Sequence, residues 1–178
     1  ATNSAVICES GHTFKANYNK SNFEGGGFAL NDCSVGIVPE TFECTQNYAA
    51  DKGGGAAFVD CKDGTFRVRG VAFTNNSAGN YGGGIYLYKV RTNVFYSDDD
   101  FRFVTISGKK EGYTYSAGKD GGGMYISNCA PAFNPDDFPN NPNKKATVSL
   151  YEMNINNCSA GGNGGGICVV ATPSLKVS

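Results

Sequence analysis

The chain of 178 residues contains seven cysteines, and three of them recur at one position of a repeated pattern. Cys33, Cys61 and Cys129 each lie eight residues after the first glycine of a Gly-Gly-Gly triplet. If the triplets mark stacked repeats, Cys33 lies above Cys61, close enough for a disulfide with modest distortion. A row of buried free thiols fits as well, because cysteine is among the most buried residue types. The odd count leaves one thiol free or available to another chain.

The other residues that could do chemistry form no recognisable motif. His12 is the only histidine and no C-x-x-C pair occurs, so the sequence does not indicate a zinc site. The acidic residues are scattered, so spacing selects no carboxylate pair for glycoside hydrolysis, a reaction that depends on geometry in the fold. None of the triplets continues into the Lys-Ser/Thr of a phosphate-binding loop. We therefore predict no catalytic residue, no cofactor and no metal.

The Gly-Gly-Gly triplet occurs five times, starting at Gly25, Gly53, Gly82, Gly121 and Gly164. A spacing of this kind, between about 20 and 50 residues, is typical of solenoids, propellers and arrays. After each triplet come three residues of which the first and third are apolar, as in Ile85, Tyr86 and Leu87. This period of two predicts a short strand with one buried face. Four residues before each triplet stands a small residue, Ala in four copies and Ser21 in one.

A unit of about 28 residues built of short strands and turns suits one coil of a parallel β-helix better than a propeller blade of about 40–50 residues. We therefore predict an all-β, right-handed parallel β-helix of roughly six coils in a single domain, 1–178. The glycines would supply turns with positive φ and close stacking at a corner. The alanines would form an inward row, and rows of Asn and Ser would bond the backbone in the turns.

Two spacings exceed this unit, so about 10 and 15 residues are inserted into the repeat. We place the first insertion within residues 91–101 and the second within the proline-rich residues 130–145. Tyr86, Tyr88 and Tyr125 should lie on the outer face of one sheet. There they could form a contact surface, or an insertion could cover them.

Composition bears on the compartment and the partners. With a net charge of −1 and no apolar run long enough to span a membrane, the chain gives no electrostatic case for nucleic acid and contains no membrane span. Asn19, Asn75 and Asn157 begin Asn-x-Ser sequons, candidates for glycosylation. Together with the cysteines, the sequons favour an oxidising, extracellular setting. The strand-like end at Leu175 suggests a partner that caps it or a piece of a longer array.

Two elements of the repeat resemble a known family. Phe14-x-x-Asn17 and Phe73-x-x-Asn76 share one pattern, and an apolar strand follows Gly-Gly-Gly in all five copies. This pairing resembles the repeats of chlamydial polymorphic membrane proteins, described by Phe-x-x-Asn and Gly-Gly-Ala-Ile/Leu/Val. The third glycine departs from that alanine, and the fourth and fifth copies lack the phenylalanine. The resemblance implies a right-handed parallel β-helix at a cell surface, with adhesive or structural roles and no catalytic residue.

The sequence thus leaves two functions in view. The first is a non-enzymatic surface or filament protein that assembles with itself or with related chains, because an uncapped β-helix exposes strand edges. The second is a β-helix that binds or cleaves polysaccharide, suggested by the tyrosines and the acidic loops. Glycans are therefore a candidate partner beside protein chains.

Overall fold

The computed structural model describes residues 5–8, 13–37, 41–66, 70–94, 104–129, 148–150, 153–172 and 175–177, and all regular structure in them is strand. His12 and residues 95–101 and 130–145 lie outside the described residues. The strands are β1 (Ala5–Cys8), β2 (Thr13–Asn17), β3 (Lys20–Ser21), β4 (Phe28–Asn31), β5 (Ser34–Ile37), β6 (Thr41–Thr45), β7 (Tyr48–Ala49), β8 (Ala56–Val59), β9 (Lys62–Phe66), β10 (Gly70–Thr74), β11 (Ser77–Ala78), β12 (Ile85–Tyr88), β13 (Arg91–Val94), β14 (Val104–Ser107), β15 (Met124–Ser127), β16 (Val148–Leu150), β17 (Met153–Asn156), β18 (Ile167–Val170) and β19 (Leu175–Val177).

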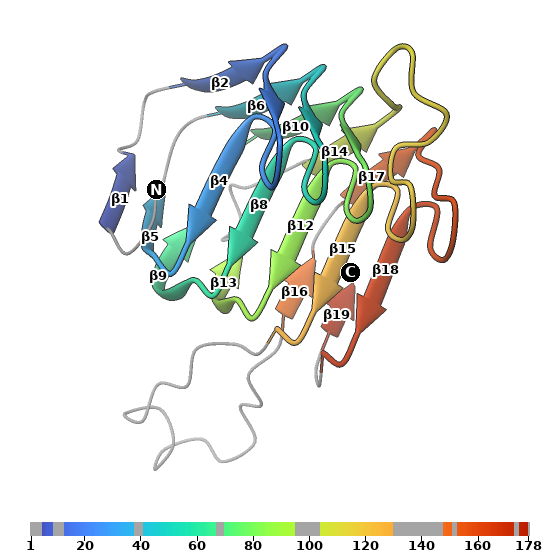
Figure 1. Ribbon diagram of the computed structural model, residues 1–178. Helices are drawn as coiled ribbons and strands as arrows, with labels where there is room; N and C mark the ends of the chain where they lie inside the picture. Colours follow the sequence, from blue (N-terminus) through green and yellow to red (C-terminus); the bar gives the residue numbers. More distant parts are fainter. Residues whose placement is uncertain are drawn as a thin grey trace.

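The strands form parallel sheets that run along a stack of coils (Figure 1). Sheet I has the order β17-β14-β10-β6-β2, and sheet II has the order β18-β15-β12-β8-β4. Sheet III contains β1-β5-β9-β13 and the pair β16-β19, with β16 beside β13. Sheets I and II therefore define five coils, and β1 belongs to a partial coil in front of the first. The predicted parallel β-helix is confirmed, with close to the predicted number of coils.

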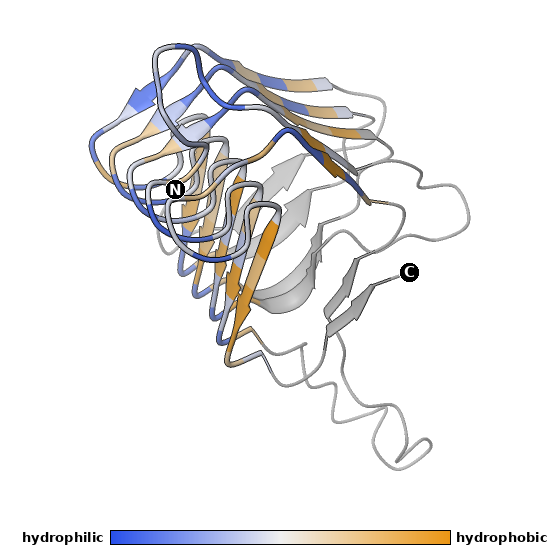
Figure 2. Cartoon of the chain, turned by 90° about the vertical axis from the view of Figure 1, so that its right-hand side faces the viewer, coloured by the Kyte–Doolittle hydropathy of each residue, from blue (hydrophilic) through white to orange (hydrophobic). Residues whose placement is uncertain are grey.

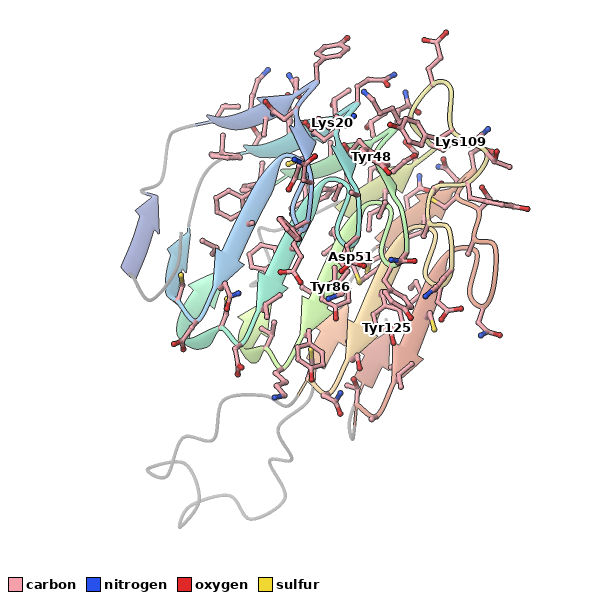
Figure 3. All side chains as sticks on the ribbon, viewed as in Figure 1. Lys20, Tyr48, Asp51, Tyr86, Lys109 and Tyr125 are labelled. Atoms are coloured by element: carbon pink, nitrogen blue, oxygen red, sulfur yellow. The ribbon has the colours of Figure 1, made fainter. Side chains whose placement is uncertain are left out.

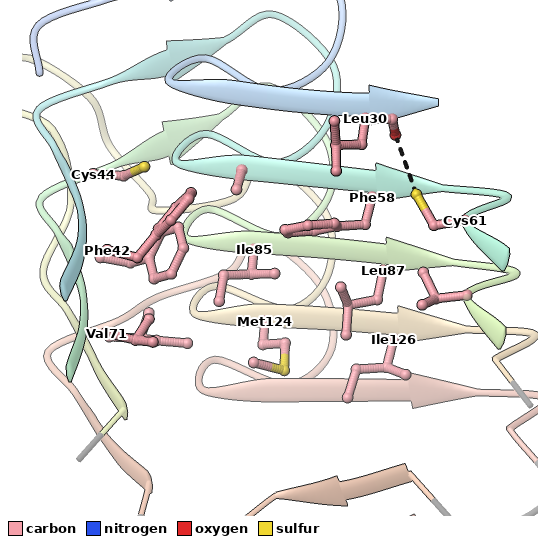
Figure 4. Close-up of a cluster of buried hydrophobic side chains, with 14 of the residues drawn as sticks. Leu30, Phe42, Cys44, Phe58, Cys61, Val71, Ile85, Leu87, Met124 and Ile126 are labelled. Carbon is pink, nitrogen blue, oxygen red and sulfur yellow. Dashed lines mark hydrogen bonds between the residues drawn. The ribbon is translucent and has the colours of Figure 1, made fainter. Parts of the chain in front are cut away.

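The core is a column of inward side chains from sheets I and II (Figure 4). Along sheet II the inward positions hold Phe28, Ala56, Ile85, Met124 and Ile167 in one row. A second row contains Leu30, Phe58, Leu87 and Ile126, each 1% exposed or less. The strand alternation read from the residues after each triplet is thus confirmed.

The predicted row of small residues is also present. Ala49, Ala78 and Ala117 pair in register between neighbouring coils and are buried. Beside them Asn19, Asn47 and Asn76 form a ladder in which each coil bonds to the next. The side chains of Asn47 and Asn76 also donate to the backbone carbonyls of Ala16 and Cys44, so these buried groups have hydrogen-bond partners.

The three glycines of a triplet meet different requirements. The first always has a positive φ, as at Gly82, where φ is 63°. The second approaches the next coil so closely that a Cβ on Gly83 would lie 2.4 Å from the carbonyl oxygen of Gly122. The third faces a core side chain, so that a Cβ on Gly84 would lie 2.6 Å from Cγ2 of Ile106. Only glycine meets the first two requirements without strain.

The first insertion lies only partly in its predicted place. Part of the predicted segment, Arg91–Val94, is strand β13, which pairs with β9. Val71 pairs with Val104, 33 residues later in the chain, whereas Ala78 pairs with Ala117, 39 residues later. The offset between neighbouring coils is 29 residues from Phe42 to Val71, so it has grown by four before β14 and grows by six more before Ala117. About four extra residues therefore precede β14, and an unpredicted loop, 109–114, carries the other six.

Candidate contact surface on sheet II

The outward side chains of sheet II gather around two tyrosines (Figure 3). Strand register places Ala29, Ala57, Tyr86, Tyr125 and Cys168 in one row, one residue per coil. Their neighbours in the strand, Ile85 and Leu87, point into the core, so the alternation turns Tyr86 outward as predicted. The outward row changes from alanine to tyrosine at the third coil, which makes this part of the face aromatic.

The tyrosines pack against one another. The rings of Tyr86 and Tyr125 are stacked, with centroids 5.5 Å apart and an interplanar angle of 10°. Tyr88 also stacks on Tyr86, with centroids 6.3 Å apart, and Tyr81 packs against Tyr125 at 4.9 Å. As a result Tyr86 is only 6% exposed, while Tyr88 and Tyr125 remain half-buried. Neighbouring rings thus bury Tyr86, a third outcome beside the two that the sequence offered.

Lysines border this aromatic cluster. The ammonium of Lys52 lies 5.5 Å from the centre of the Tyr86 ring, and that of Lys119 lies 5.6 Å from Tyr81. Lys89 approaches Tyr88 in the same way, at 5.3 Å. Each distance is within the range of a cation–π contact. We call Lys52, Tyr81, Tyr86, Tyr88 and Tyr125 the tyrosine cluster.

Charged groups beside the cluster are paired. Lys52 Nζ lies 3.1 Å from Glu24 Oε1 and 3.2 Å from Asp51 Oδ2. Partial burial lowers the pKa of Lys52, but the hydrogen bonds to Glu24 and Asp51 outweigh it and the net pKa is raised. Burial raises the pKa of Tyr86 to about 12, against a smaller opposing effect of Lys52. Both groups therefore keep their protons at neutral pH.

Asp51 and Asp120 also accept hydrogen bonds from neighbouring coils. Asn80 Nδ2 donates to Asp51 Oδ1 at 2.8 Å, and the backbone N–H of Asn163 donates to Asp120 Oδ1 at 2.6 Å. These carboxylates link coils along the stack. No group of three metal-ligating side chains occurs within the described residues.

The unpredicted loop, 109–114, covers the corner between sheets I and II. The ring of Tyr113 stacks on Tyr48 with centroids 4.5 Å apart, and the backbone N–H of Lys110 donates to Ser77 Oγ at 2.9 Å. Lys110 Nζ also donates to the carbonyl of Gln46. The sequence does not indicate where this loop lies. The spacing of the triplets shows that residues are inserted, but they could come before or after a strand.

The cysteines correct one prediction. Cys33 and Cys61 are buried free thiols and form no disulfide. Instead the Cys33 thiol donates to the carbonyl of Asn31 at 3.2 Å, and the Cys61 thiol donates to that of Leu30 at 3.8 Å (Figure 4). Burial raises the pKa of Cys61 to about 11, so this thiol stays protonated. The alternative of a buried thiol row matches the structure.

The sequons occupy the turn that follows sheet I. Asn75 and Asn157 both have positive φ, at 54° and 52°. The Nδ2 of Asn19, the atom to which a glycan would be attached, donates to Asn47 Oδ1 at 3.2 Å. A glycan on Asn19 would replace one of the two hydrogens on this nitrogen, at the start of the asparagine ladder.

The two Phe-x-x-Asn segments do not occupy equivalent places in the coil. Phe14 pairs with Phe42, whereas Phe73 pairs with Cys44, two positions further along the strand. The structural repeat is instead an inward residue followed three residues later by Asn19, Asn47 or Asn76.

Within the described ranges no helix is long and apolar enough to cross a membrane. Comparison with known proteins adds no assignment: no family model, no curated protein and no solved structure matches this chain.

Proposed function

We propose that this chain is a non-enzymatic, extracellular structural protein that assembles with itself or with related chains in a fibre or surface layer. The observation that carries this proposal is the open pair of ends. β2 and β4 are the outermost strands at one end of sheets I and II, and β17 and β18 are outermost at the other. Among the described strands, each of these four has a neighbouring strand on one side only. Such edges readily pair with another chain.

The lateral face supports a structural role. Between neighbouring coils, Lys15 pairs with Glu43 and Lys52 with Glu24, both at N···O distances close to 3 Å. The asparagine ladder and the carboxylates of Asp51 and Asp120 bond in the same direction. Polar side chains are thus used to join coils, as expected in a stiff, extended element.

The test is the state of association of the purified chain at high micromolar concentration. Sedimentation velocity and light scattering should show species larger than the monomer that grow with concentration. Reducing agent should leave them intact, because the described thiols are free. A monomer at every concentration would reject the proposal.

A second candidate is a polysaccharide-binding face at the tyrosine cluster. Half-buried Tyr125 packs against Tyr81, whose row continues with Asp120 and Asn163. This combination of ring faces and hydrogen-bonding groups suits sugars. A glycan array, with uronic-acid lyase and hydrolase assays with and without calcium, tests both binding and cleavage. Binding that Tyr125→Ala abolishes would support this candidate, whereas no binding and no turnover would remove it.

A further inference from the structure

At the C-terminal end of the stack, no close contact with the described residues explains why the second position of the triplet is glycine. In the first four coils the second glycine of the triplet is buried, and a Cβ on it would lie 2.2–2.4 Å from a carbonyl oxygen of the next coil. In the last coil a Cβ on Gly165 would meet nothing closer than 3.6 Å, and Gly165 is exposed. Gly165 is therefore shaped for a close contact that lies beyond the fifth coil.

The backbone at this turn has the matching donors free. In each earlier coil the second glycine donates its N–H to the first glycine of the next coil, as Gly122 does to Gly164 at 3.0 Å. The third glycine donates to the third glycine of the next coil, as Gly123 does to Gly166. Within the part of the chain that the structure describes, the N–H groups of Gly165 and Gly166 make no such bond.

The N-terminal coil presents the complementary acceptors. Gly25 and Gly27 donate to the second coil, but among the described residues nothing donates to their carbonyl oxygens. An N-terminal coil placed in register on the fifth coil would give Gly165 N–H to Gly25 O and Gly166 N–H to Gly27 O. This repeats the bonding between every neighbouring pair of coils within the chain.

The apolar core is incomplete at the same two ends. The partly buried side chains packed against the core all come from the first or the last coil: Phe14, Phe28, Met153, Ile155, Cys158 and Ile167. Val169 occupies the inward row of Leu87 and Ile126, yet it is 39% exposed. Figure 2 views this end, where β18 is hydrophobic along its length. In register, Phe14 would cover Met153 and Phe28 would cover Ile167.

From these observations we infer that a second copy of this chain docks its N-terminal coil, β2 to β5, on β17, β18 and residues 164–166, head to tail and in register. The inference rests on the proposed function and specifies which surfaces join. Charge does not oppose it, because Lys15 and Glu24 would face Asn154 and Asn163, which are both uncharged. A contact that repeats at both ends leads to a fibre.

One strand must move before two copies can dock in this register. β1 lies one level in front of the first coil in sheet III, the level that β19 of the neighbouring copy would occupy. Within the described ranges β1 pairs with β5 alone and β19 with β16 alone, so either can leave with the loss of one ladder. Ile7→Pro, which weakens the β1–β5 ladder, should therefore retain or strengthen association. Loss of association in this variant would contradict the register.

The decisive variant is Gly165→Leu, whose side chain would project from the C-terminal end. Gly165 is not among the glycines with positive φ, so leucine can adopt its backbone conformation. We expect an unchanged melting temperature at low concentration and loss of association by sedimentation velocity. Glu111→Leu, on an exposed residue of the loop, is the matched control and should associate like the parent chain. If Gly165→Leu affects folding, Gly165→Ala provides the same test with a single methyl.

Mixing separates head-to-tail docking from other arrangements. A Gly165→Leu chain retains its N-terminal coil, so it should add to parent fibres and prevent further growth, which shortens them at substoichiometric ratios. In a symmetric joint between two C-terminal ends the variant would be inert. Association that persists in Gly165→Leu would overturn this inference and leave the proposed function standing. A parent chain that never associates would overturn both.

Discussion

Asn47 shows how a single residue joins three coils. Its side chain donates to the carbonyl of Ala16 at 2.7 Å and to Asn76 Oδ1 at 3.0 Å, and its Oδ1 accepts from the N–H of Asn19. Asn47 and Ala16 are both buried, so water does not readily replace the bond between them. Each buried group left without a partner costs about 1–3 kcal/mol.

We therefore expect Asn47→Ala to lower the free energy of unfolding by about 3 kcal/mol, since it leaves the Ala16 carbonyl and the Asn19 N–H unbonded. Urea denaturation followed by circular dichroism measures this change. Asn22→Ala, at an exposed position, is the control and should change stability by less than about 0.5 kcal/mol. Equal effects of the two substitutions would show that the ladder does not stabilise the stack.

Tyr86 gives a prediction for pH. Burial raises its pKa from 10.0 to about 12, so the folded chain keeps a proton that the unfolded chain loses. The resulting stability is fully present below pH 10 and is lost as the pH rises towards 12. At about 1.4 kcal/mol per pKa unit, the loss approaches about 3 kcal/mol.

Tyr86→Phe should accordingly lose less stability than the parent chain across this alkaline range. Buried thiols such as Cys44, whose pKa burial raises to about 12, contribute equally in both proteins and cancel in the comparison. Tyr88→Phe removes the hydroxyl of the adjacent ring and should follow the parent. Denaturation midpoints at several alkaline pH values measure the difference, and parallel curves for parent and Tyr86→Phe would refute the assignment.

At the scale of the element, the glycine turn depends on its place in the stack. A methyl group on Gly83 would lie 2.4 Å from the carbonyl oxygens of Gly122 and Ser116, which belong to the next coil. The same group on Gly165 would meet only an ordinary contact, 3.6 Å from the carbonyl of Cys158. The same substitution should therefore have opposite effects in the two coils.

Gly83→Ala should destabilise the chain by about 3 kcal/mol or more, because the backbone of two coils would have to separate. Gly165→Ala should be neutral or stabilising by up to about 1 kcal/mol, because alanine restricts the unfolded chain. Chemical denaturation below the concentration of assembly measures both. A comparable loss in the two variants would mean that the glycines are needed for the turn itself and not for the next coil.

The glycine turns also show how far sequence reasoning reaches. Five triplets in one register, each followed by an alternation such as Ile85, Tyr86 and Leu87, were enough to predict the coils and the inward face. The small residue before each triplet predicted the buried row of Ala49, Ala78 and Ala117. These features are local, and the same pattern recurs in the sequence of every coil.

Features that depend on contacts between coils could not be predicted in this way. Residues inserted at 109–114 lengthen the spacing between triplets in the same way as residues inserted before β14. The number of residues between two triplets therefore could not locate this loop. Tyr86 is outward by alternation, but its burial depends on Tyr88, Tyr125 and Lys52 around it. The choice between disulfide and free thiol at Cys33 and Cys61 likewise depends on where the two side chains point.

At the scale of the whole molecule, stability should vary along the stack. Each coil contacts only its neighbours, so an end coil has half the contacts between coils that a middle coil has. Ile85 and Ile126 are fully buried in the middle, whereas Ile155 and Ile167 at the end are half-buried. Amide hydrogens of β8, β12 and β15 should therefore exchange most slowly, and those of β17 and β18 faster.

Concentration should change this gradient if the ends join. Hydrogen exchange measured by mass spectrometry, at dilution and at high micromolar concentration, should show protection rising with concentration in β17, β18 and the turn at Gly165. Protection in β12 should stay constant, because both of its edges are already paired within the chain. Gly165→Leu should remove the dependence on concentration at the C-terminal end while leaving the dilute pattern unchanged. Slow exchange in β18 at the lowest concentration would show that its edge is already covered and would contradict the open end.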